Sequence, residues 1–144
     1  MIKSQKIVIG FDGSEYSKKA VEYTVNNFDK KSTIYLLYVE EMLAPLYLSN
    51  PSLFIDDDVI KKIREKTKNE LKRQVEIIKK KGFKAQYEYV EGYPPNQIIN
   101  EAKRKNADII VVGSRGMGKW KGSVLGSVSQ ALTVISKIPL LIIK

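Results

Sequence analysis

The sequence contains no cysteine and no histidine among its 144 residues. Without cysteine it cannot form a disulfide, a thiol nucleophile or a Cys-ligated zinc or iron–sulfur site. Without histidine it has no Ser-His-Asp triad and no imidazole metal ligand. The apolar runs are short, and 34–39 and 138–143 are six residues each. We therefore expect no membrane span and no signal peptide, and a cytoplasmic location.

The charge is strongly basic, with 25 Lys and Arg against 16 Asp and Glu, or +9. Such a balance could suit nucleic acid, an anionic membrane or a phosphate-bearing ligand. The run 56–81 mixes ten basic with six acidic residues, as a solvated helix face does. The segment 113–144 instead holds five basic residues and no acid. One unopposed positive segment therefore adjoins a cluster of glycines.

Length and patterning predict a single domain over residues 1–144. Short runs rich in Val, Ile, Leu and Tyr predict strands at 7–11, 34–39, 85–90, 109–112 and 139–143. Apolar residues at three- and four-residue spacing predict helices at 14–28, 57–81, 95–105 and 127–137. Strict alternation indicates a doubly wound α/β fold, with a parallel sheet and helices on both faces. In such folds ligands bind beyond the carboxyl ends of the strands.

Two segments between these elements stand out. On the helix expected at 57–81, one apolar stripe would include Ile60, Ile63 and Leu71. The connection 40–55 is long, apolar and contains two prolines. It either packs onto that helix or forms a lid or partner surface.

The glycine-rich segment 113–129 directly follows the fourth expected strand. Gly126 and Ser127 open a helix, whose free N–H groups and dipole favour an anion. Arg115, between glycines, could donate charge-assisted hydrogen bonds to a phosphate. Ser127 with Gln130 also fits a capping box, which is a purely structural use of the same residues.

Two better-known phosphate motifs are excluded in this segment. Gly113, Gly118 and Lys119 match G-x-x-x-x-G-K, but Trp120 stands where a P-loop needs the Ser or Thr that binds magnesium. The dinucleotide fingerprint fails because Lys121 occupies the place of its third glycine.

A second polar segment, 11–17, follows the first expected strand. Asp12 falls at the strand's carboxyl end, where its carboxylate can accept from ribose hydroxyls or help to hold a metal. Ser14 is a suitable N-cap for the helix that follows. A turn with an N-cap explains every residue here except the position of Asp12.

These segments together resemble the universal stress protein family over essentially the whole chain. The family signature is Gly, two residues, Gly, nine residues, then Gly-Ser or Gly-Thr. This sequence has Gly113, Gly116 and Gly126-Ser127 in that register. The D-G-S-E-x-S segment at 12–17 and the closing P-L-L-I-I strand at 139–143 match as well.

The resemblance implies a five-stranded parallel sheet in the order 3-2-1-4-5, of the adenine nucleotide alpha hydrolase-like type. It implies binding of ATP, or of ADP or AMP, with Mg²⁺ or Mn²⁺ on the phosphates. Asp12 would face the nucleoside and the Val39 backbone would contact adenine, while the glycine-rich segment surrounds ribose and phosphates. The expected site residues are Phe11, Asp12, Val39, Gly113, Arg115, Gly116, Gly126, Ser127, Val128 and Ser129.

The function expected from this resemblance is that of a nucleotide-dependent stress-response regulator without a catalytic residue. A slow ATP hydrolase using Asp12 and a divalent metal is one alternative. A basic nucleic-acid-binding protein is another, although the sequence shows no RNP, KH or zinc signature and its lysines are widely spread. A homodimer through the strand 139–143 is also expected, because Lys137 and Lys144 only flank that apolar edge and many family members pair there.

Overall fold

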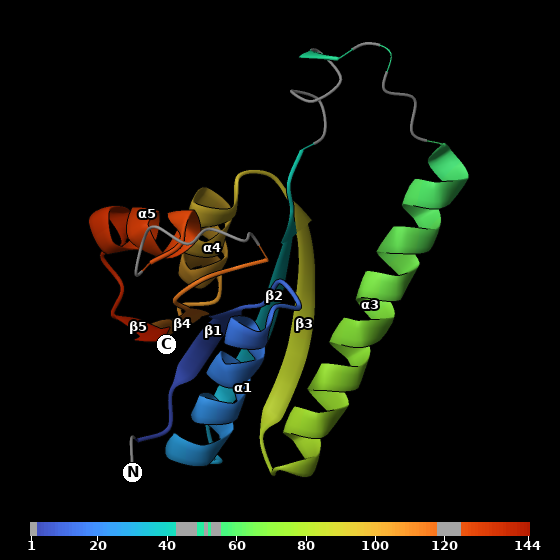
Figure 1. The fold of residues 1–144 in the computed structure, drawn as a ribbon. Helices are drawn as coiled ribbons and strands as arrows, with labels where there is room; N and C mark the ends of the chain where they lie inside the picture. The colour runs from blue at the N-terminus through green and yellow to red at the C-terminus, as the bar shows by residue number, and fades with distance from the viewer. Residues whose placement is uncertain (1–2, 43–48, 51, 53–55, 118–124) are drawn as a thin grey trace.

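The computed structural model describes residues 3–42, 49–50, 52, 56–117 and 125–144. Five strands and four helices alternate along these residues, each within one or two residues of the predicted bounds (Figure 1). They are β1 (Lys6–Gly10), α1 (Glu15–Asn27), β2 (Thr33–Glu40), α3 (Asp57–Lys80), β3 (Lys84–Glu91), α4 (Pro94–Arg104), β4 (Ile109–Gly113), α5 (Ser127–Ile135) and β5 (Leu140–Ile143).

The strands form one sheet in the order β3-β2-β1-β4-β5, and every neighbouring pair is parallel. In the register, Ile9 of the central strand lies between Leu36 of β2 and Val111 of β4. The order reverses at β1, since β2 lies on one side of it and β4 on the other. The predicted strand order and fold class are therefore confirmed.

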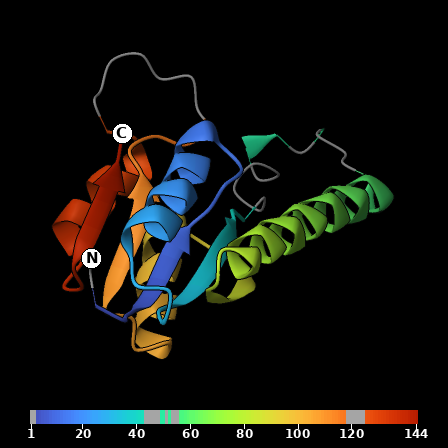
Figure 2. The same ribbon diagram turned by 90° about the horizontal axis from the view of Figure 1, so that it is seen from below.

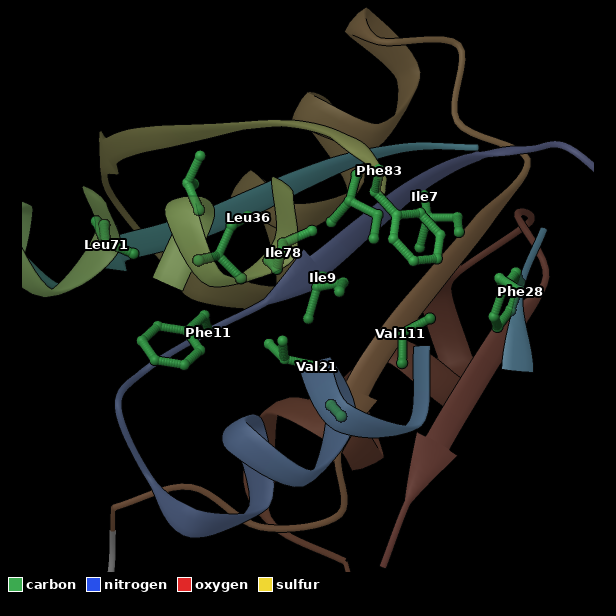
Figure 3. Packing of buried hydrophobic residues seen from close by; sticks show 13 residues of the cluster. Ile7, Ile9, Phe11, Val21, Phe28, Leu36, Leu71, Ile78, Phe83 and Val111 are labelled. Atoms are coloured by element: carbon green, nitrogen blue, oxygen red, sulfur yellow. The ribbon is translucent and has the colours of Figure 1, made fainter. Parts of the chain in front are cut away.

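Each face of the sheet carries its own apolar core because successive strand residues point to opposite faces. α1 and α3 cover one face and α4 and α5 the other (Figures 1 and 2). On the first face Ile9 and Leu36 are fully buried against Leu71 and Ile78 of α3 (Figure 3). β1 is thus covered on both sides, which explains its nearly continuous apolar sequence.

The helices α1 and α5, which follow the two segments matched in the sequence, begin differently from each other. Ser14 is the N-cap of α1, as predicted, and its hydroxyl accepts from the Ser17 N–H at 3.2 Å. The predicted Ser127 capping box is wrong, because Gly126 occupies the cap position of α5 and Ser127 is the first helical residue. Gln130 donates its side-chain amide to the Leu125 carbonyl at 2.8 Å instead.

The predicted apolar stripe of α3 is buried only in its C-terminal half. Leu71 is fully buried, whereas Ile63 is 58% exposed although it belongs to the same stripe. A 24-residue helix is about 36 Å long, while the eight-residue strands β2 and β3 span only about 26 Å. The first turns of α3 therefore extend past the sheet, as Figure 1 shows.

Part of the sequence prediction lies outside the described residues. Most of the connection 40–55 belongs there, so its packing onto α3 stays a prediction. Trp120, which decided against a P-loop, and Lys121, which decided against the dinucleotide fingerprint, also lie there. Within the part of the chain that is described, no helix is both long and apolar enough to cross a bilayer.

Candidate functional site

The carboxyl ends of β1, β2 and β4 open into one pocket of about 730 Å³. It lies where the strand order reverses, the usual ligand position in open α/β sheets, and has the volume of a small-molecule site. All ten residues named from the sequence line it. Segments as far apart as 11–12, 39, 113–116 and 126–129 therefore meet at one place, although their contacts with a ligand stay a prediction.

Asp12 and the glycine-rich segment approach each other closely. One carboxylate oxygen of Asp12 accepts from the Ser14 N–H at 2.9 Å, which fixes the side chain against the start of α1. The other oxygen would lie 2.7 Å from a Cβ placed on Gly116. A side chain at 116 would therefore push against the carboxylate. Gly116 allows Asp12 to stay where it faces the pocket.

Gly113, the first glycine of the same signature, has a different role. A Cβ at this position would lie 2.6 Å from the backbone carbon of Tyr16 and 2.8 Å from its carbonyl oxygen. Both atoms belong to α1, and a helix backbone cannot shift as a flexible side chain can. Gly113 therefore lets β4 pack directly against α1. It lines the pocket, but its missing side chain serves the packing of the fold.

The N-terminus of α5 is held against the end of β4. The Gly126 N–H donates to the Ser114 carbonyl at 2.6 Å, and the Ser114 N–H donates to Ile143 of β5 at 2.7 Å. The next three N–H groups, of residues 127–129, have no acceptor inside the helix, by helix geometry. They lie at the pocket together with the positive end of the helix dipole. This part of the pocket is suited to an anion.

Ser129 connects the same two segments through its side chain. It is 2% exposed, and its hydroxyl lies 2.9 Å from the Ser114 carbonyl and 3.0 Å from the Gly126 carbonyl. Because the hydroxyl donates its one hydrogen within the chain, the backbone amide is the donor that Ser129 can still offer to a ligand. The side chain holds the anion end of the pocket in shape.

The pocket also has a buried apolar part and a more exposed acidic part. Leu37, Ile98 and Val112 are buried residues of the lining, from β2, α4 and β4. Such a surface can bury the face of a flat heterocycle. Glu40 and Glu41, which follow Val39, add carboxylates at the rim. The pocket thus has an apolar floor, an acidic rim and an anion-binding end.

The sequence reasoning missed several residues of the lining. Pro94 and Ile98 come from the start of α4, which follows β3, and no chemical motif marks them. The rule that ligands lie beyond strand ends could have pointed to Pro94. Glu40 and Glu41 close β2, and the same rule could have found them. Met117 follows the glycines and is 70% exposed.

A divalent cation would find few protein ligands here. Within the described ranges no three acidic side chains gather closely enough to hold one. Mg²⁺ commonly binds through one or two carboxylates together with substrate phosphates and water. The carboxylates that line the pocket are those of Asp12, Glu40 and Glu41.

Comparison with known proteins agrees with this architecture. The universal stress protein family matches residues 3–144. The chain belongs to this family. The universal stress protein YxiE of Bacillus subtilis is 32% identical over 145 residues, which cover 96% of this chain and 98% of that protein.

Solved structures of the family have the same fold. The protein MJ0577 of Methanocaldococcus jannaschii superposes with a TM-score of 0.83 at 26% identity, covering 96% of this chain and 94% of that one. A family member from Arabidopsis thaliana, solved with AMP bound, superposes with a TM-score of 0.66 at 22% identity. That comparison covers 100% of this chain and 92% of the plant protein.

Proposed function

We propose that this universal stress protein binds ATP, or its products ADP and AMP, and acts as a nucleotide-dependent regulator of a stress response in the cytoplasm. The observation that carries the proposal is the pocket of about 730 Å³, in which the family signature meets Asp12 and Val39. The AMP found in the Arabidopsis relative supports an adenine nucleotide as the ligand class.

In this proposal different parts of the pocket bind the base, the ribose and the phosphates. The base lies on the apolar floor and meets the Val39 backbone, and the ribose faces Asp12. The phosphates meet Arg115 and the N–H groups at the start of α5. The apolar lining, which suits a base, and the helix N-terminus, which suits phosphates, support this assignment.

The phosphate contacts alone would bind weakly. A helix N-terminus contributes ~0.3–2 kcal/mol toward an anion, and a hydrogen bond to a charged group ~1.5–3 kcal/mol. Micromolar affinity needs about 8.2 kcal/mol. The remainder must come from the base, which is why the buried floor of Leu37, Ile98 and Val112 matters. Free phosphate should therefore bind far more weakly than a nucleotide.

A regulator fits the described side chains better than an efficient hydrolase. Asp12 has one oxygen engaged with the Ser14 N–H, and its place beside Gly116 suits a nucleoside or cation contact. Mg²⁺ or Mn²⁺ would lie on the phosphates and offset their charge. Slow hydrolysis with Asp12 and that cation is the alternative.

Mass spectrometry of the purified protein, followed by calorimetry with ATP, ADP and AMP in the presence and absence of Mg²⁺, tests the proposal. We expect near-stoichiometric adenine nucleotide and ATP binding in the micromolar range. Conversion of bound ATP to ADP over hours would favour the slow hydrolase. Absence of binding of all three nucleotides would refute the function.

We further propose that β5 pairs with its copy in a homodimer. The strand lies at the sheet edge, and all four of its apolar residues are only partly buried. On the adjoining α5, Val134 is 84% exposed and Ile135 43% exposed, which extends the apolar surface. A twofold axis would satisfy both strand edges. Sedimentation should give a dimer for the wild type and for a Val59→Lys control, and a monomer for Ile142→Lys. A monomeric wild type would exclude this interface.

A further inference from the structure

Carboxylates gather where β2 ends. Glu40 is the last residue of β2 and lies beside Glu91, the last residue of β3, in the parallel register. Glu40 also lines the pocket, as do Glu41 and Asp12. Like charges placed side by side repel each other and would also repel an anionic ligand in the pocket. A cationic side chain next to Glu40 would reduce this repulsion.

Arg64 of α3 is placed to offset it. Its Nε lies 2.9 Å from Oε1 of Glu40, across 24 residues of sequence. Leu36 and Tyr38 of β2 pack in the cluster on the α3 face, while Val39 packs in the opposite one. By this alternation the Glu40 side chain lies on the α3 face, where Arg64 holds it. The pair therefore joins the rim of the pocket to a helix that itself contributes no residue to the lining.

Two tyrosines complete the cluster around Glu40. The rings of Tyr38 and Tyr89 stack with centroids 5.2 Å apart, and the Lys68 ammonium lies 5.1 Å from the Tyr89 centroid. Burial, the charge of Glu40 and a hydrogen bond to it raise the pKa of Tyr89 to about 12. Tyr89 thus stays neutral and donates to Glu40. The Glu40 carboxylate therefore has two partners on the α3 face, Arg64 and Tyr89.

We propose that Arg64 is a specificity-determining residue of the nucleotide site: by holding the Glu40 carboxylate on the α3 face and offsetting its charge, it sets how negatively charged a ligand the pocket accepts. This inference rests on the proposed nucleotide binding. Arg64 acts through Glu40 and need not touch the ligand itself.

The dimensions of the pocket make this effect measurable. The Debye length is ~8 Å at physiological ionic strength and ~30 Å at 0.01 M salt. At low salt a charge at the rim is therefore felt throughout a pocket of about 730 Å³, and the effect scales with ligand charge. Removing Arg64 should penalise ATP more than AMP, and AMP more than adenosine.

The experiment compares Arg64→Ala with a matched control, Arg73→Ala. Arg73 lies on the same helix and forms a similar exposed ion pair, 2.9 Å from Glu70, but is remote from the lining. Calorimetry at low salt with ATP, AMP and adenosine should show ATP affinity reduced about 3- to 10-fold in Arg64→Ala. Adenosine affinity should change less than about twofold, and Arg73→Ala should bind all three ligands as the wild type does.

Charge restoration separates this role from a merely structural one. The double variant Arg64→Ala with Glu40→Gln should recover most of the ATP affinity, and Arg64→Lys should retain it. The ATP defect of Arg64→Ala should shrink at about 1 M salt, where screening shortens the Debye length to ~3 Å. Urea unfolding of each variant verifies that it is folded.

The outcomes of this experiment distinguish a failure of the proposed nucleotide binding from a failure of the inference about Arg64. If the wild type binds no nucleotide, both the proposed function and this inference are overturned. If the wild type binds ATP but Arg64→Ala matches Arg73→Ala, only the inference is overturned. Equal weakening of ATP and adenosine without rescue by Glu40→Gln would also overturn it, because Arg64 would then only support the packing of α3.

Discussion

Gly113 and Gly116 belong to one sequence signature, but the structure predicts different consequences for the same substitution. At Gly113 an added Cβ would meet the backbone of Tyr16 at 2.6 Å. At Gly116 it would meet only a carboxylate oxygen of Asp12, at 2.7 Å, which is the far end of a side chain. Gly113→Ala should therefore damage the fold, and Gly116→Ala should damage the site.

The size of each loss depends on which atoms the added Cβ would have to displace. Overpacking a well-packed interior costs typically ~1–3 kcal/mol, and the upper end applies at Gly113 because helix backbone is the obstacle. For a domain of this size that corresponds to a fall in Tm of roughly 5–10 °C. At Gly116 stability should change by less than about 0.5 kcal/mol. Displacing Asp12 should lower ATP affinity about tenfold, the loss of roughly one hydrogen bond to a charged group.

Urea unfolding and ATP calorimetry on both variants form the assay. A Gly113→Ala protein as stable as the wild type would show that the close approach of β4 and α1 is not as described. Wild-type ATP affinity in a folded Gly116→Ala protein would remove the contact between Asp12 and position 116 from the site. Gly113→Ala should mainly lower stability, and Gly116→Ala should mainly lower ATP affinity. Equal effects on stability and binding in both variants would refute the different roles of the two glycines.

Two further predictions concern charge. Arg115→Ala should weaken ATP about 1.5–3 kcal/mol more than adenosine if Arg115 meets phosphate, and calorimetry giving equal losses for both ligands would show that it only supports the loop. Tyr89 has a pKa near 10 when unfolded and about 12 when folded, so the folded state binds more protons between these values and stability falls as pH rises from 10 to 12. The part of this fall that is due to Tyr89 should be fully developed only above pH 12. Urea unfolding across this range should show a flatter pH dependence for Tyr89→Phe, and an identical dependence would argue against the burial of Tyr89 beside Glu40.

Much of the fold could be read from local patterns. Continuous apolar runs marked the strands because both faces of this sheet are covered, and three- and four-residue spacing marked the helices. The glycine signature marked one side of the pocket because its spacing is itself local. Ser14 was recognisable as an N-cap for the same reason, since its partner Ser17 lies only three residues away.

Errors arose where a neighbour distant in sequence decides the outcome. Ser127 fits a cap by pattern, but Gly126 takes that place because its N–H is bound by Ser114, twelve residues earlier. Ile63 fits the apolar stripe of α3, but the strands beneath the helix end before they reach it. Spacing along a helix shows which residues share a face and does not show how far the sheet extends.

The sequence by itself determined the kinds of element, their order and the end of the sheet at which the pocket opens, because each depends on residues within one turn, strand or loop. Only the tertiary structure decided that Gly113 serves packing, that the Ser129 hydroxyl is used within the chain and that Arg64 meets Glu40. These contacts depend on distances between elements brought together by burial of the two cores. A pattern of residue types in one chain does not contain those distances.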